Sequence, residues 1–274
     1  MSPVSPAASD TTPARIGSLL RALRVRRRQS QLALAMDTGV SQRHLSCLET
    51  GKAQPSQPML LALLDALGVP LAERNQALMA AGFAPRYPRS DWSAQGLAPV
   101  REALHRLLVA HEPAPAMLLD AQWNLLEINA AVPALMRLIG FSPPAAEGSE
   151  PLNLLDLLLG PQGLKPWLVD APRIAQAVRR RAGAEAPFNP ALAHRLQALP
   201  EETRHRSGQP SAEPSPPDSP VLLLQLRSQA GVLSFISATT TLGSPLDVTL
   251  DSLRIDHLLP ADSTTRTALE RALT

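Results

Sequence analysis

The chain has few of the residues that build disulfide-linked, zinc-bound or membrane-spanning proteins. Its only cysteine among 274 residues is Cys47, which excludes an internal disulfide and a zinc site made of several cysteines. No apolar run approaches the roughly 20 residues that a membrane-spanning helix needs. Residues 1–13 have neither a basic start nor an apolar core, so we predict a disordered tail there and not a signal peptide. We therefore expect a cytoplasmic protein.

The sequence also lacks the motifs of common enzymes. It contains no G-x-S-x-G nucleophile elbow and no H-E-x-x-H zinc motif. Gly51-Lys52 is not surrounded by the residues of a phosphate-binding loop. His105 and His111 are six residues apart, on different faces of a helix, and so form no metal site with Glu112. We expect no catalysis, no metal and no cofactor.

Lysine is nearly absent, since only Lys52 and Lys165 occur, and arginine carries most of the positive charge. Between Arg15 and Lys52, eight basic residues stand against two acidic ones, a net charge of +6, whereas the whole chain has a net charge of +2. The remainder of the chain is therefore net acidic. This asymmetry favours a polyanionic partner for the N-terminal part alone.

The most informative stretch is SQLALAMDTGVSQRHLSCLETG, which begins at Ser30. Ser30 and Ser41 stand where an N-cap residue opens a helix, and Gly39 can take the positive φ of a tight corner. Leu45 and Leu48, three residues apart, would point from the second helix into a core. This pattern predicts a helix-turn-helix. The side chains left to face a nucleic acid are Gln42, Arg43, His44, Ser46 and Cys47.

Apolar periodicity predicts further helices on both sides of this motif. One includes Ile16, Leu20 and Leu23, another starts after Pro58 and stops at Gly68, and a fifth covers 72–81. Five short helices make a compact bundle, so we predict a DNA-binding domain over 14–84. Arg43 is the leading specificity residue, because an arginine fork matches guanine. The alternative reading of Arg43 is a solvated arginine on an exposed face.

The runs Leu19-Leu20-Arg21-Ala22-Leu23-Arg24, Gly39-Val40-Ser41 and Leu48-Glu49-Thr50-Gly51-Lys52 resemble the Cro/repressor-type helix-turn-helix of the xenobiotic-response-element (XRE) family. The resemblance implies that Gln31 touches a phosphate or base and that Lys52 contacts backbone phosphate. The base-facing positions that it implies are Gln42, Arg43 and Cys47, with Ser46 alongside. We add Ser41 and Arg24 to the predicted DNA-binding residues, and we expect loss of Arg24 or Lys52 to flatten the salt dependence of binding. Because Ala33 and Cys47 depart from the usual family residues, the operator sequence stays open.

A proline-containing linker is predicted over 85–97, and a second domain over 98–274. Its expected helices cover 100–109, 130–139, 152–159, 161–169, 171–182, 190–199 and 264–273, and its expected strands cover 116–120, 123–128, 221–228, 232–240 and 248–257. A Pro/Ser-rich mobile loop is predicted over 203–220. The predicted class is α+β, a five-helix DNA-binding bundle followed by a PAS-like domain with helices over one face of a five-stranded antiparallel sheet.

The second domain resembles the ligand-binding domain of MmyB-like transcription regulators. The matching segments include His111-Glu112-Pro113, Trp123-Asn124, Asn129-Ala130-Ala131, 239–250 and 258–262. The resemblance implies a pocket for a small apolar molecule, with a fatty acid as the leading candidate. Trp123, Asn129 and Phe235 are candidates to line or gate the pocket. Their alternative roles are a core plug for Trp123 and a helix cap for Asn129.

We therefore predict a transcription regulator that binds a two-fold operator as a homodimer, because one helix reads too few base pairs for useful specificity. A small apolar ligand would modulate its affinity for double-stranded DNA, and repression is favoured over activation. The alternative is a DNA-binding adaptor or antitoxin-type protein whose C-terminal domain binds a protein partner.

Overall fold

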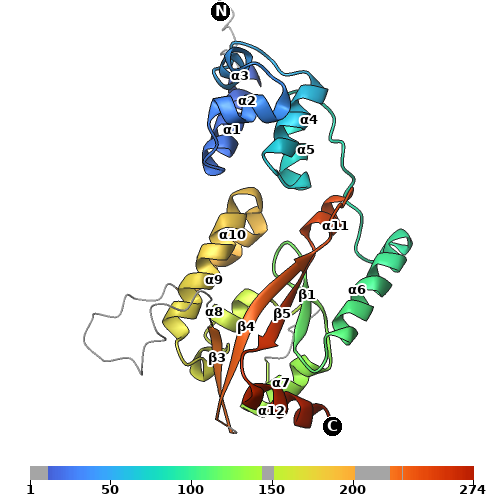
Figure 1. Cartoon of the computed structure of the whole chain (residues 1–274), viewed down its shortest axis with the longest axis vertical. Helices are drawn as coiled ribbons and strands as arrows, with labels where there is room; N and C mark the ends of the chain where they lie inside the picture. The colour runs from blue at the N-terminus through green and yellow to red at the C-terminus, as the bar shows by residue number, and fades with distance from the viewer. Residues whose placement is uncertain (1–11, 144–150, 201–222, 230) are drawn as a thin grey trace, which may run out of the picture. The chain divides into compact units, whose positions relative to one another are not determined.

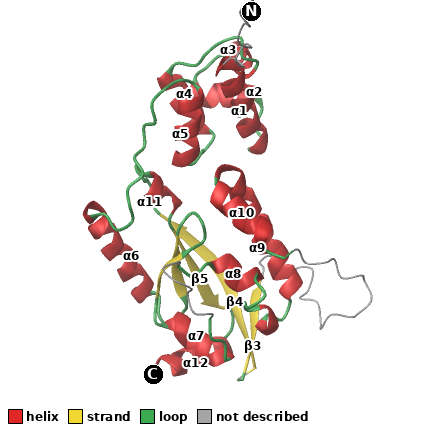
Figure 2. Cartoon of the chain, turned by 180° about the vertical axis from the view of Figure 1, so that it is seen from behind, coloured by secondary structure: helices red, strands yellow, loops and turns green. Residues whose placement is uncertain are grey.

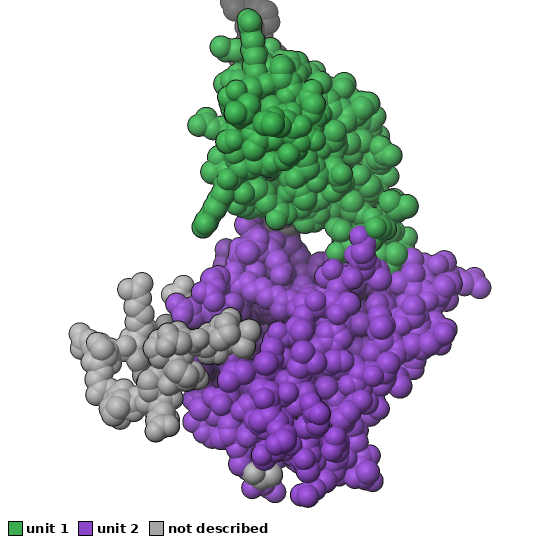
Figure 3. Space-filling view, viewed as in Figure 1, with its two compact units in different colours: residues 1–90, 244–251 green, residues 91–243, 252–274 purple. Residues whose placement is uncertain are grey.

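A computed structural model describes residues 12–143, 151–200, 223–229 and 231–274 (Figure 1). Figure 2 shows the secondary structure of the chain, and Figure 3 colours its two compact units. Unit 1 comprises residues 1–90 with 244–251, and unit 2 comprises 91–243 with 252–274. None of the helices in the described residues is long and apolar enough to cross a membrane. The predicted loop over 203–220 lies outside the described residues.

Five helices occur in the described residues of the N-terminal part of unit 1, in agreement with the sequence-based prediction. They are α1 (Thr12–Arg26), α2 (Gln31–Thr38), α3 (Gln42–Glu49), α4 (Gln57–Ala66) and α5 (Leu71–Ala80). Helix α1 begins at Thr12, inside the predicted tail, whose first eleven residues are not described. Helix α4 begins at Gln57 and not after Pro58, because the Ser56 hydroxyl accepts a hydrogen bond from the Met59 amide and proline is tolerated in a first turn.

The core of unit 1 is built almost entirely of leucine. Leu34, Leu45 and Leu48 from the two motif helices have no exposed surface. Burying one such side chain stabilises a fold by about 1.5–3 kcal/mol. Other core residues come from α1 and α4, and include Ile16, Leu20, Leu23, Leu60, Leu63 and Leu64. The helix-turn-helix is therefore anchored on a shared apolar core.

The corner between α2 and α3 confirms the local predictions. The Ser30 hydroxyl accepts from the Ala33 amide at 3.0 Å, and the Ser41 hydroxyl accepts from the His44 amide at 3.2 Å. Gly39 ends α2 with a φ of +70°. A Cβ built at Gly39 would meet nothing within 4 Å. Glycine is favoured at this position by the left-handed backbone, which costs an L-residue roughly 1–2 kcal/mol, and not by lack of space.

Gly17 is a second glycine that the helix-turn-helix depends on, and sequence reasoning missed it. A Cβ at Gly17 would lie 2.3 Å from the carbonyl oxygen of Leu48. Helix α1 therefore approaches the last turn of α3 at a distance that only a glycine allows.

Unit 2 contains a five-stranded sheet in the order β2-β1-β5-β4-β3, with every neighbouring pair antiparallel. The strands are β1 (Ala116–Leu119), β2 (Leu125–Ile128), β3 (Leu223–Ser228), β4 (Gly231–Thr241) and β5 (Arg254–Pro260). The predicted antiparallel sheet of five strands is thus confirmed for the described residues.

The helices of unit 2 lie on both faces of this sheet. They include α6 (Ala98–Ala110), α7 (Ala131–Ile139), α8 (Leu154–Leu159), α9 (Ala171–Glu185), α10 (Pro190–Ala198) and α12 (Ser263–Leu273). Helix α6 is followed by His111, whose ring contacts His257 with centroids 4.3 Å apart. Because strand side chains alternate, His257 faces away from its neighbour Asp256, which lines a cavity with residues of α7, α8 and α9. The prediction of helices over one face only was wrong.

Two further predictions are corrected by the structure. A single turn of 3-10 helix, Lys165–Trp167, occurs within the helix predicted over 161–169. A Cβ at Gly163 would lie 2.3 Å from the Leu157 carbonyl oxygen, so the chain folds tightly back on α8 before that turn.

The strand predicted over 248–257 was also partly wrong, because it begins as the short helix α11 (Val248–Ser252) and only then becomes β5. The Asp247 carboxylate accepts hydrogen bonds from the amides of Thr249 and Leu250. This side chain caps a helical turn in a segment whose apolar pattern resembles a strand.

Candidate functional site

Helix α3 separates its residues into a buried face and an outward face. Leu45 and Leu48 are fully buried. Gln42 and Arg43 are exposed, and Cys47 is half-buried. The outward face thus offers a planar amide and a guanidinium, the two groups that match adenine and guanine edges in a major groove.

Three other predicted DNA contacts surround this face. The Ser41 hydroxyl caps α3 by accepting the His44 amide, and its own proton remains available to a phosphate oxygen. Ser46 is half-buried, and Lys52, which follows the helix, is exposed. These positions are compatible with the predicted roles.

Arg24, a predicted phosphate contact, has a structural role within unit 1. Its guanidinium donates to both carboxylate oxygens of Glu49 at 2.6 and 2.8 Å, and to the Gln29 carbonyl oxygen at 2.8 Å. The side chains of Arg24 and Glu49 are 11% and 2% exposed. Three of its five N–H groups thus have partners within the protein, and little of the side chain is exposed. Sequence reasoning missed this ion pair because the partner is 25 residues away in the sequence.

Gln31 joins the same network by donating its side-chain amide to Glu49 at 2.8 Å. Its oxygen remains an acceptor for a base or a water molecule. Burial by itself raises the pKa of Glu49, but hydrogen bonds from Arg24 and Gln31 and the Arg24 charge outweigh it and lower the pKa. Glu49 is therefore ionised at neutral pH and ties α1, α2 and α3 together.

Three consecutive arginines, Arg26, Arg27 and Arg28, stand at the end of α1, and the first two contribute to packing. Arg26 pairs with Glu73 of α5 at 3.0 Å. Arg27 donates to the carbonyl oxygens of Leu67 and Gly68. These arginines hold α1 against the end of α4 and against α5, so the net charge of the segment overstates the number of side chains directed at a polyanion.

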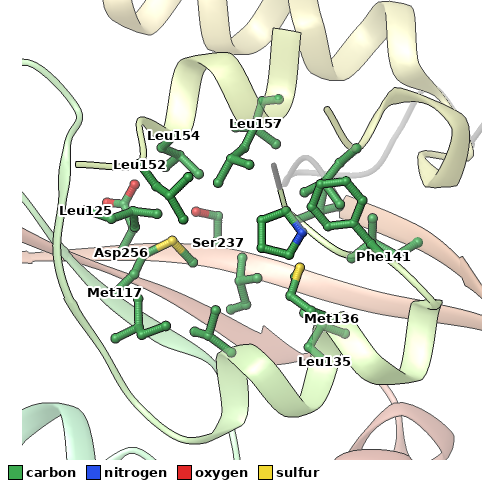
Figure 4. Close-up of a pocket in the computed structure, with 18 of the residues that line it drawn as sticks. Met117, Leu125, Leu135, Met136, Phe141, Leu152, Leu154, Leu157, Ser237 and Asp256 are labelled. Carbon is green, nitrogen blue, oxygen red and sulfur yellow. The ribbon is translucent and has the colours of Figure 1, made fainter. Parts of the chain in front are cut away.

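Unit 2 encloses a cavity of about 640 Å³ between one face of the sheet and helices α7, α8 and α9. Figure 4 shows Leu135 and Met136 of α7 on one side, with Leu154 and Leu157 of α8 across from them. Among the 27 described residues that line it, five are polar or charged: Arg137, Ser142, Arg181, Ser237 and Asp256. A mostly apolar cavity with a few polar groups is typical of a small-molecule site.

Two of these polar groups are joined by a bidentate ion pair. Asp256 is 5% exposed and accepts from Arg181 at 3.1 and 3.0 Å. It also accepts from the Thr239 hydroxyl at 2.9 Å. Sequence reasoning missed both members of the pair, because Arg181 and Asp256 are 75 residues apart and neither residue belongs to a local motif.

A tryptophan in contact with two arginines adjoins this pair. The guanidinium carbons of Arg254 and Arg181 lie 4.5 and 5.1 Å from the centre of the Trp123 ring, and the indole nitrogen donates to Glu185 at 2.8 Å. Burial lowers the pKa of Arg254, and the charges of Glu185 and Asp256 only partly offset that effect. The indole thus forms one wall of the cavity and supports its charged end.

Only one of the three predicted ligand-site residues lines the cavity. Trp123 is 1% exposed and lines the cavity. Phe235 is fully buried in a core cluster and does not line it. Asn129 also lies outside the lining, where it accepts from the Ala116 amide and donates to the carbonyl oxygens of Leu108 and Ala114. Asn129 is not the side-chain cap of α7, because the N-cap position belongs to Ala130.

Comparisons with known proteins match both parts of the chain. Residues 100–272 match the family model of the MmyB-like transcription regulator ligand binding domain. Residues 15–77 match a helix-turn-helix domain. A search of curated proteins finds no match. Among solved structures, the clp gene regulator ClgR from C. glutamicum is 27% identical over 27% of this chain and 92% of that chain, with a TM-score of 0.24.

Proposed function

We propose, on the premise that the chain belongs to the MmyB-like transcription regulators, that α3 reads an operator and that a fatty acid in the unit 2 cavity changes operator affinity. The family and the helix-turn-helix make the chain a ligand-modulated transcription regulator. The operator contacts, dimeric binding, repression and the fatty acid are our proposals.

The observation that carries the DNA-binding proposal is the division of α3. Leu45 and Leu48 fix the helix to the core, while Gln42 and Arg43 are exposed on it. A two-fold dimer would place two such helices in successive major grooves, which gives enough base pairs for specificity. Binding of that dimer over a promoter represses the neighbouring gene by occupying it.

The cavity supports an acyl ligand. Its wall is leucine-rich along most of its length, and Arg181, Ser237 and Asp256 provide a small number of polar groups. A fatty acid has the same division into an apolar chain and one polar end. By linkage, such a ligand changes operator affinity only by as much as it prefers one arrangement of the protein over another.

Replacing Arg43 by alanine is expected to cost about 1–3 kcal/mol of operator binding and to relax the preference at one base pair. Selection of bound fragments from random genomic DNA gives the site, and titration of that site gives the affinity. Lys52→Ala should weaken binding equally on all sequences and reduce the salt slope by about 1.

Arg86→Ala is the matched control, because Arg86 is an exposed arginine of unit 1 outside the helix-turn-helix. It should leave both the selected site and the salt slope unchanged. If Arg43→Ala selects the same site with unchanged affinity, Arg43 is a solvated arginine and the assignment is wrong.

The purified protein is expected to retain a long-chain fatty acid, which mass spectrometry after denaturation would detect. An apolar cavity of this size favours retention, because release exposes the chain of the ligand to water. A protein that retains no lipid and does not bind added palmitate would contradict the fatty-acid proposal. That outcome would favour the adaptor alternative, in which unit 2 binds a protein.

A further inference from the structure

The chain that connects β4 to β5 does not stay with the sheet of unit 2. Residues 244–251 belong to unit 1, although the strands on either side belong to unit 2. We call these eight residues the coupling segment. They include most of α11.

One end of the coupling segment caps a helix of the DNA-binding unit. The Asp251 carboxylate accepts a hydrogen bond from the Leu71 amide, the first residue of α5, at 2.7 Å. Pro70, at the N-cap position, makes no side-chain cap. Asp251 therefore supplies from 180 residues away the acceptor that a helix start needs, with a negative charge at the positive end of the helix dipole.

The other end holds the stretch that follows α5. Asp247 is 7% exposed and accepts from the Ser90 amide at 3.0 Å and the Ser90 hydroxyl at 2.7 Å. The Thr249 hydroxyl donates to the Ser90 carbonyl oxygen, and the Val248 amide donates to the Pro88 carbonyl oxygen at 2.8 Å. Four hydrogen bonds thus fix this stretch at Pro88 and Ser90.

The two strands that the coupling segment connects, β4 and β5, carry polar groups of the cavity. Ser237 of β4 and Asp256 of β5 both line it. Thr241 and Arg254, which flank the coupling segment, are paired across the two strands. A shift of β4 against β5 is therefore passed to both ends of the segment through a few bonded residues.

We propose that the coupling segment transmits the occupancy of the cavity to the DNA-binding unit through Asp247 and Asp251. The inference rests on the proposed function and adds the element that links its two halves. A ligand that moves β4 relative to β5 changes the cap of α5 and the anchor at Ser90. Glu73 of α5 forms an ion pair with Arg26 of α1. The change at α5 therefore reaches α1 and the bundle that positions α3.

The test compares wild type with Asp251→Ala, with the Asp247→Ala/Asp251→Ala double variant and with Leu246→Ala. Leu246 lies in the same segment and is 77% exposed, which makes it the matched control. Coupling is reciprocal, so adding the selected operator fragment should change hydrogen exchange in 231–241 and 254–260 of wild type and Leu246→Ala. Asp251→Ala should reduce that change and the double variant should abolish it.

Unchanged exchange in these strands of wild type, or an undiminished response in the double variant, would overturn the inference. If the double variant does not fold, Asp251→Ala alone decides, and an undiminished response there overturns it. A second measurement is the effect of palmitate on operator Kd, expected to be about tenfold in wild type and close to onefold in the double variant.

The two levels of proposal fail separately in this design. In one outcome, the operator changes hydrogen exchange in a way that requires Asp251, but palmitate has no effect on Kd. That outcome would support the role of the coupling segment and refute the fatty-acid proposal. If the double variant keeps both tight operator binding and the effect of palmitate, the proposed function is supported and the role of the coupling segment is refuted. Absence of any operator preference removes both.

Discussion

Replacing Glu49 by alanine is expected to lower the free energy of unfolding of unit 1 by about 3 kcal/mol, because it leaves the Arg24 guanidinium buried without its partner. Arg24 would lose two of its three hydrogen bonds, and Gln31 would lose its acceptor. The loss is a large fraction of the roughly 5–15 kcal/mol by which a folded domain is stable. Urea denaturation followed by circular dichroism measures it.

The control is Glu102→Ala, which removes the exposed ion pair with Arg106 on α6. An exposed pair of this kind is worth about 0.3–0.5 kcal/mol. Equal losses for Glu49→Ala and Glu102→Ala would show that the buried network does not hold the three helices together.

The same network predicts a dependence of stability on pH. The pKa of Glu49 is below its ordinary value of 4.5 in the folded state. Its contribution is therefore complete above the unfolded pKa and is lost as the pH falls through the lower, folded pKa. The stability difference between wild type and Glu49→Ala should accordingly shrink on acidification below about pH 4.5.

Filling the cavity is expected to have the second large effect. Ala177 lies on α9 and lines the cavity, so Ala177→Trp would place an indole where we propose the acyl chain binds. Palmitate affinity should fall at least about tenfold, equal to about 1.4 kcal/mol. Displacement of a fluorescent fatty acid measures the affinity, and a melting curve confirms that the variant is folded.

Gln176→Trp is the matched control for this variant. Gln176 precedes Ala177 on the same helix and is exposed, so its replacement adds the same indole outside the cavity. Operator affinity without lipid should be the same in both variants. Full palmitate binding by Ala177→Trp would place the acyl chain elsewhere.

The sequence was most informative where the determinants are local. Ser30, Ser41 and Gly39 act within three or four residues of their own positions, and the leucine spacing on α3 follows from one helical period. The helix-turn-helix could therefore be predicted before any tertiary contact was known.

Long-range contacts set the limits of that prediction. Arg24 was assigned to DNA because nothing near it in the sequence indicates Glu49 as its partner. The pairing of Arg181 with Asp256 depends on how α9 lies over the sheet, and so could not be predicted either. At Asp247 the local apolar pattern favoured a strand, while the carboxylate capped a helical turn.

The close approach of Gly17 to the Leu48 carbonyl oxygen has a consequence for how this regulator can diverge. A methyl group at Gly17 would collide with main chain, which cannot rotate away as a flexible side chain can. Substitution of Gly17 therefore cannot change the tilt of α3 in small steps. New operator preferences in descendants of this chain should arise by exchange of residues such as Gln42 and Arg43 on an unchanged frame.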